Sequence, residues 1–285
     1  MDSFIIVDSG STKSDWLFLR GDCCLAQIRL AGMNPHFTSP TEMQSEIERG
    51  VPEHLRLCAW THLCFYGSGC TPGTVQSMAE TLRSSFSIRH LSVESDLVGA
   101  ARALWGTSPG IACILGTGSA AGFYDGTAIT HRSPSLGYIL GDEGSGAHLG
   151  KLLVNAVLKH QVPPQTEQCF NQYVRAIISV KEGLESAIID RVYHAPFPNR
   201  FLARLSPFLK EHIGEEWARD LTLQAFRLFL AHNVRPLGAA PSVGFVGSIA
   251  HYYQDILPQA ASLEGITISQ ITQSPLAGLK QYHVH

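Results

Sequence analysis

The 285-residue sequence contains few charged residues and no run of basic ones. Lysine, arginine, aspartate and glutamate together make up 16% of the chain, and the formal net charge is −3. Proteins that bind nucleic acid usually carry a clustered basic surface, so this class of function is not favoured. The apolar runs are short, and MDSFIIVDSG at the start has neither a charged leader region nor a cleavage site. We therefore expect no membrane span and no signal peptide.

Paired cysteines are missing as well. The chain has seven cysteines, an odd number, and no Cys-x-x-Cys motif. Zinc sites usually show such tight pairs, and a secreted disulfide framework usually has an even number. Cys58, Cys64 and Cys70 are spaced by six in a segment that we interpret as a buried strand, where cysteine serves as a small apolar residue. We expect reduced thiols, a cytoplasmic protein, and no metal or iron–sulfur cluster bound by cysteine.

Apolar stretches that end in glycine recur along the chain and alternate with helical patterns. The segments that predict a strand followed by a loop are residues 4–10, 62–69, 111–119 and 242–248. Two predicted helices begin at the caps Ser39 and Thr71, each followed by proline. Two further helices are predicted over residues 95–106 and 214–234. This alternation is typical of an α/β fold with a largely parallel core. With 45% hydrophobic residues, the chain can form two domains.

An internal repeat suggests that the two domains are similar. Residues 5–11, IIVDSGS, align with residues 113–119, CILGTGS, and a second strand and a turn follow each copy. A loop of small residues between two strands exposes backbone N–H groups that can bind an anion. Two such loops would suit a polyphosphate, with Lys13 adding a charge and Asp8 holding Mg²⁺ through water. Two tight hairpins without a ligand are the structural alternative.

Other segments combine acids with glycine or with a helix start. Asp96 follows the helix cap Ser95, so its carboxylate is either a helix-dipole partner or a catalytic group. Gly99 lies inside that helix at a cost of roughly 1 kcal/mol relative to alanine, so we expect another group to approach closely there. Asp142 and Glu143 stand among five glycines in LGYILGDEGSGAHLGK, where one acid could bind sugar hydroxyls. The Walker motif G-x-x-x-x-G-K-[ST] is absent.

In chain order, the motifs are DSGSTKSDW, AGMNPH, ESDLVGAA, ILGTGS, GYILGDEGSG, GFVGSIA and SPLAGL. This series resembles the sugar-kinase/heat-shock-70/actin superfamily over essentially the whole chain. Within it, the match is to the N-acetylglucosamine kinase branch and its relatives among the BadF/BadG-type ATPases. Many N-acetylglucosamine kinases have Gly-Trp-Gly before GDEGS, whereas this chain has LGYILGDEGSG. We therefore expect a different wall beside the 2-acetamido group.

The resemblance implies two ribonuclease-H-like (actin-like ATPase) domains around a central cleft. The first would comprise residues 1–107, and the second residues 108–285 with a helical insertion, unless the last helix packs back on the first domain. The resemblance also implies ATP and Mg²⁺ as cofactors, a small-molecule sugar as substrate, and a homodimer without nucleic-acid or membrane partners.

The resemblance assigns residues to four groups. The first phosphate motif is matched by Asp8, Gly10, Ser11, Thr12 and Lys13, and the second by Gly116, Thr117, Gly118 and Ser119. The adenosine motif is matched by Gly247 and Ser248, with help from Ala277 and Gly278. The sugar-side positions are Asn34, Gly69, Asp96, Gly137 and Asp142, with Asp96 as the base.

The implied activity is transfer of the ATP γ-phosphate to the primary hydroxyl of an amino sugar, with N-acetylglucosamine as the first expectation. One alternative is an activator ATPase of a CoA-linked dehydratase or reductase, which would need cysteines that bridge an iron–sulfur cluster between subunits; the sequence shows none suitably placed. The other is a non-catalytic sugar-sensing module, against which the presence of Asp8, Asp96 and Asp142 argues.

Overall fold

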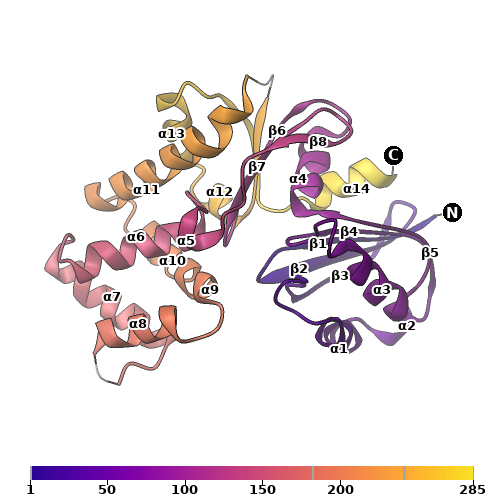
Figure 1. Cartoon of the computed structure of the whole chain (residues 1–285), viewed down its shortest axis with the longest axis horizontal. Helices are drawn as coiled ribbons and strands as arrows, with labels where there is room; N and C mark the ends of the chain where they lie inside the picture. The colour runs from indigo at the N-terminus through magenta and orange to yellow at the C-terminus, as the bar shows by residue number, and fades with distance from the viewer. Residues whose placement is uncertain (1, 182, 240–241, 285) are drawn as a thin grey trace. The chain divides into compact units, whose positions relative to one another are not determined.

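A computed structural model describes residues 2–181, 183–239 and 242–284 of the chain (Figure 1). The chain divides into two compact units, each described by itself below. Unit 1 comprises Met1–Ala112, Phe123–Thr130 and Ser274–His285, and unit 2 comprises Cys113–Gly122 and His131–Gln273. The predicted domains, residues 1–107 and 108–285, are each one continuous segment, whereas unit 1 combines three segments of the chain and unit 2 combines two.

The first sheet has the strand order β3-β2-β1-β4-β5. Its strands are β1 (Ser3–Ser9), β2 (Lys13–Arg20), β3 (Cys23–Ala31), β4 (Ala59–Gly67) and β5 (Ser87–Ser95). Strands β1, β4 and β5 run parallel, while β2 pairs antiparallel with both β1 and β3. The sheet is therefore mixed, and the prediction of a largely parallel core was wrong for this part, because short turns join β1, β2 and β3 as hairpins.

Helices cover both faces of the first sheet. One face packs against α1 (Pro40–Gly50) and α3 (Val75–Ser85) through an apolar cluster that includes Trp16, Phe18 and Phe65. The other face packs against α4 (Asp96–Trp105) and α14 (Leu276–Val284), which lie beside each other (Figure 1). The C-terminal helix thus belongs to unit 1.

The second sheet repeats the strand order of the first. Its order is β10-β9-β6-β7-β8, so its strands, in chain order, occupy the same places as β1 to β5. They are β6 (Gly110–Leu115), β7 (Ser119–Tyr124), β8 (Ile129–Arg132), β9 (Val243–Val246) and β10 (Ile268–Thr272). Strands β9 and β10 are parallel, as β4 and β5 are. The α/β class and the internal repeat of residues 5–11 and 113–119 are confirmed.

A run of helices separates β8 from β9. Its helices are α5 (Gly137–Leu140), α6 (Gly146–Leu158), α7 (Pro164–Ile177), α8 (Leu184–Tyr193), α9 (Pro198–Ala203), α10 (Ser206–Glu211), α11 (Glu216–Phe229), the π-helix η1 (Leu230–Val234) and the 3₁₀-helix η2 (Arg235–Leu237). The remaining helices are α2 (Glu53–Arg56), α12 (Ser248–Tyr252) and α13 (Leu257–Leu263). Among the described residues, no helix combines the length and apolarity that crossing a membrane requires.

The helix caps agree with the sequence at two of three predicted starts. Ser39 caps α1 through a reciprocal capping box with Glu42, and Ser95 caps α4 by accepting from the amide of Val98. The third helix, α3, begins at Val75 rather than after Thr71. The Thr74 hydroxyl instead donates to the carbonyl of Gly69, which makes an extra turn before the helix.

Candidate functional site

In unit 1, the site residues gather where three parallel strands end. Asp8 and Ser9 end β1, Gly67 ends β4, and Ser95 ends β5 directly before Asp96. Parallel strands present their carboxyl ends at one edge of the sheet, so these residues meet although they lie far apart in the sequence. The N-terminus of α4 places Asp96 at this same edge.

Asp8 and Asp96 influence each other electrostatically. Burial raises the pKa of Asp8 to about 7, and the charges of Asp96 and Asp15 add to this effect. Burial also raises the pKa of Asp96 to about 6. The amide of Leu97 donates to Asp96 Oδ1 at 2.9 Å, and this hydrogen bond lowers the pKa. Two carboxyl groups in a desolvated place favour a bound cation or a shared proton.

The loop between β1 and β2 is a closed hairpin. The amide of Gly10 donates to the carbonyl of Lys13 at 2.9 Å, and the amide of Gly32 donates to the carbonyl of Thr12 at 3.1 Å. The Gly10 amide therefore stabilises the turn itself, and the role of Gly10 in phosphate binding stays a prediction. The Lys13 ammonium lies 3.3 Å from Asp15, and its charge lowers the pKa of Asp8.

A chain of hydrogen bonds joins Asn34 to Asp96. The buried Asn34 donates from Nδ2 to the Ser68 hydroxyl at 3.5 Å, and that hydroxyl hydrogen-bonds to the Asp96 carboxylate. The neighbouring Gly69 has φ +81°, and a Cβ there would lie 2.3 Å from Asn34 Oδ1, so only glycine fits. Asn34, Gly69 and Asp96 thus lie close together, and their role at a sugar site stays a prediction.

Ser68 is the residue of this candidate site that the sequence interpretation missed, and it links Asn34 to Asp96. It lies between Gly67 and Gly69 just after β4, in YGSGC, and its amide donates to the carbonyl of Ser9 at 2.8 Å. Serine between two glycines at a strand end was the available signal, but small residues also fill ordinary turns.

In unit 2, the second loop joins β6 to β7. The amide of Gly116 donates to the carbonyl of Gly118 at 3.0 Å and closes the turn. The first turn of α6 adds two bonds, from Gly146 to the carbonyl of Gly116 and from Ala147 to that of Thr117. The amide of Ser119, at the start of β7, donates to a carboxylate oxygen instead.

That carboxylate belongs to Asp142. Its Oδ1 accepts from the Ser119 amide at 3.1 Å, and a Cβ on Gly118 would lie 3.0 Å from its Oδ2. Burial raises the pKa of Asp142, and the charge of Glu143 adds to this effect. The structure therefore joins Asp142, predicted for the sugar side, to the loop between β6 and β7. Gly137, at the start of α5, lies a few residues before it.

The predicted adenosine residues occupy two places. Gly247 and Ser248 lie where β9 passes into α12, and a Cβ on Gly247 would lie 2.2 Å from the carbonyl oxygen of Leu115, directly before Gly116. The β9 turn and the second loop are therefore neighbours within unit 2. Ala277 and Gly278 belong to α14 of unit 1, where a Cβ on Gly278 would lie 2.2 Å from the carbonyl oxygen of Ala103. Helix packing accounts for Gly278, and its nucleotide role stays a prediction.

The donor chemistry suits a magnesium ion at Asp8. Burial is the main cause of the raised pKa of Asp8, and the negative charges of Asp96 and Asp15 add to it, so a bound cation would stabilise the ionised carboxylate. Mg²⁺ keeps several waters and takes few carboxylates, so one protein ligand is sufficient. Among residues 2–181, 183–239 and 242–284, no three histidine, cysteine or acidic side chains form a metal cluster. All seven cysteines are free thiols.

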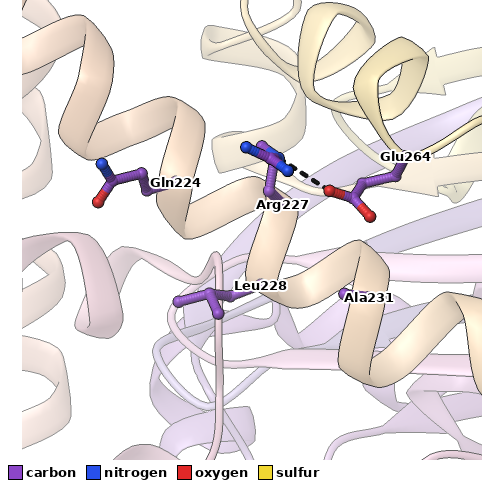
Figure 2. A pocket seen from close by; sticks show the side chains of 5 residues that line it. All are labelled: Gln224, Arg227, Leu228, Ala231 and Glu264. Atoms are coloured by element: carbon purple, nitrogen blue, oxygen red, sulfur yellow. Dashed lines mark hydrogen bonds and ion pairs between the residues drawn. The ribbon is translucent and has the colours of Figure 1, made fainter.

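A pocket lies along α11 and the π-helix η1. Gln224, Arg227, Leu228 and Ala231 line it together with Glu264 (Figure 2). The Arg227 Nε donates to Glu264 at 2.8 Å, so the charged groups of this pocket are paired within the protein.

Known proteins similar to this chain are found among solved structures. A proposed N-acetylglucosamine kinase from Porphyromonas gingivalis is 38% identical, with 99% of this chain and 98% of that one covered and a TM-score of 0.92. A proposed N-acetylglucosamine kinase from Chromobacterium violaceum has 20% identity, coverage of 100% and 99%, and a TM-score of 0.73. A ROK-family glucokinase from Streptomyces griseus, solved with glucose and AMPPNP, has 14% identity, coverage of 99% and 97%, and a TM-score of 0.60. No protein-family model and no curated protein matches the chain.

Proposed function

Because the chain belongs to the family of the Porphyromonas gingivalis protein, whose fold it shares over nearly its whole length, we propose that it is an ATP-dependent sugar kinase. The acceptor would be the primary hydroxyl of an amino sugar, and N-acetylglucosamine is the substrate that we propose. The identity of 38% supports the reaction class, and the name given to the relative supports the sugar. The remaining neighbours support the fold alone.

The observation that carries this proposal is the pair of carboxyl groups at the end of β1 and the start of α4. Asp96, with a pKa of about 6, is ionised at neutral pH and would accept the proton of the attacking hydroxyl. A base whose pKa lies just below the working pH combines ionisation with useful basicity. Ser68 and the amide of Leu97 hydrogen-bond to that carboxylate and would orient it.

The other side chains would bind and orient the two substrates. Asn34 can both donate to and accept from sugar hydroxyls, whereas ionised Asp142 can only accept. Phosphoryl transfer depends mostly on positioning and on neutralising charge. Asp8 would hold the Mg²⁺ that neutralises the phosphates, and the residues around Gly118, Gly247 and Ser248 would bind the nucleotide.

The test is an ADP-release assay on the purified protein with a panel of sugars. The panel contains N-acetylglucosamine, glucosamine, N-acetylmuramic acid, N-acetylmannosamine and glucose, each with ATP and Mg²⁺. We expect the highest kcat/KM with N-acetylglucosamine and a product phosphorylated at the primary hydroxyl. Absence of ADP release with every sugar would refute the kinase, and preference for another sugar would refute the substrate alone.

A further inference from the structure

The loop that carries Asp142 has a strained backbone. Asp142 adopts φ +55°, a left-handed conformation that costs most residues energy and persists only where the surroundings enforce it. The conformation places its carboxylate on the Ser119 amide of the second loop. Groups close to Asp142 must therefore stabilise this backbone.

Two contacts fix the residues that follow Asp142. The Asn233 amide donates from Nδ2 to Glu143 Oε2 at 3.1 Å, and the backbone amide of Gly144 donates to His148 Nδ1 at 3.1 Å. The imidazole of His232 lies 3.8 Å from the other oxygen of Glu143. The hydrogen bond from Asn233 thus orients Glu143, across ninety positions of the sequence.

Asn233 is itself held in place. It is buried, and its backbone carbonyl accepts from the Ser133 hydroxyl at 2.5 Å. The backbone amide of Ser133 donates to the carbonyl of Ala121 in β7 at 3.0 Å. A continuous path of hydrogen bonds therefore runs from the second sheet through Asn233 to Glu143. The sequence interpretation missed Asn233, since it treated residues 214–234 as one regular helix.

The helix is not regular at this point. The α-helix α11 ends at Phe229, and residues Leu230–Val234 form a π turn, η1. An α-helix rotates by 100° per residue, so the wider π turn changes which residues face the loop. Outside the turn, Glu264 accepts from Arg227 before it at 2.8 Å and from Arg235 after it at 2.6 Å (Figure 2 shows the first pair). The turn is thus fixed on both sides, and single π turns within α-helices are frequent at functional sites.

We propose that Asn233 is a positioning residue: the π turn directs its amide onto Glu143, and Glu143 holds the neighbouring Asp142 carboxylate on the Ser119 amide of the second loop. The effect of Asn233 on catalysis rests on the proposed sugar kinase activity, whereas its effect on the loop that carries Asp142 does not. Glu143 acts through its hydrogen bond and needs no contact with a substrate.

The test exchanges donor and acceptor between positions 143 and 233. In Asn233→Asp two carboxylates face each other, and in the double variant Glu143→Gln/Asn233→Asp an amide again faces a carboxylate with the original total charge. Asn233→Ala removes the donor, and Asn155→Asp, an exposed position on α6, is the matched control. Hydrogen exchange of the peptide 137–147 in the ligand-free protein reports on the loop, and kcat and KM report on catalysis.

We expect Asn233→Asp and Asn233→Ala to accelerate exchange of this peptide by about tenfold, as loss of a hydrogen bond to a charged group would. The double variant should restore wild-type exchange and the sugar KM, and Asn155→Asp should change neither. Unchanged exchange in both single variants, or no restoration in the double variant, would overturn the role of Asn233. If wild type has no kinase activity, the proposed function fails, and the exchange measurements still decide this role.

Discussion

Replacing Asp96 with asparagine tests both the proposed role of this buried carboxylate as the base and its effect on stability. The side chain keeps its size and its acceptor oxygen, so the amide of Leu97 retains a partner. The variant cannot accept a proton from the sugar hydroxyl, and we expect kcat to fall by roughly 10²- to 10⁴-fold.

The same substitution should stabilise the folded protein at neutral pH. Burial raises the Asp96 pKa from 3.8 to about 6, so the folded state binds this proton more tightly than the unfolded state. The raised pKa therefore destabilises the fold progressively as pH rises from about 4 to 6. At about 1.4 kcal/mol per pH unit, the cost above pH 6 is on the order of 3 kcal/mol. Asparagine carries no charge and does not have this cost.

Denaturant unfolding at two pH values, together with steady-state kinetics, measures both effects. We expect Asp96→Asn to be more stable than wild type at pH 7.5 and nearly equal to it at pH 4, where Asp96 is protonated in the folded protein. Asp220→Asn, an exposed change on α11, is the control and should alter neither stability nor rate. Activity of Asp96→Asn within a few-fold of wild type would refute this account of Asp96. So would a stability gain over wild type that is no larger at pH 7.5 than at pH 4.

Three other predictions concern unit 1. Asp8→Ala should weaken binding of Mg²⁺–ATP in calorimetry and leave sugar binding without nucleotide nearly unchanged; the opposite pattern would mean that the ligands are assigned to the wrong residues. Ser68→Ala removes a hydrogen bond that lowers the Asp96 pKa, so the acidic limb of kcat/KM should move to higher pH; an unmoved limb would exclude this contact. Asn34→Ala should raise the sugar KM by an amount corresponding to about 1–3 kcal/mol at constant ATP affinity. Wild-type sugar kinetics in Asn34→Ala would place the sugar elsewhere.

The sequence predicts those parts of the site that depend on local signals. Strand ends, the cap at Ser95 and the acid after it are recognisable because each is encoded within a few residues. The close approach expected at Gly99 is confirmed, since a Cβ there would lie 2.8 Å from the Tyr66 side chain. Tyr66 itself could not be named, because the contact joins two residues that lie 33 positions apart in the chain.

The π turn and the link from Asn233 to Glu143 could not be predicted in the same way. Apolar periodicity over residues 214–234 favours one continuous helix, and nothing local marks the point where Leu230 begins a wider turn. The turn is stabilised by contacts with Glu143, Ser133 and Glu264, which are distant in sequence. Tertiary hydrogen bonds outweigh helix periodicity here.

The internal repeat accounts for the strand order that the two sheets share. Its two copies differ in where each loop obtains a carboxylate. Aligning residues 5–11 with 113–119 places Asp8 opposite Gly116 and Ser11 opposite Ser119. The first copy has its acid at the strand end, where it lies near Asp96. The second copy has glycine there and receives a carboxylate from Asp142, which lies on a later loop and bonds to the Ser119 amide. If the second loop binds phosphate through this amide, as we propose, the phosphate would have to displace the Asp142 carboxylate, and nucleotide binding would then be coupled to the position of Asp142.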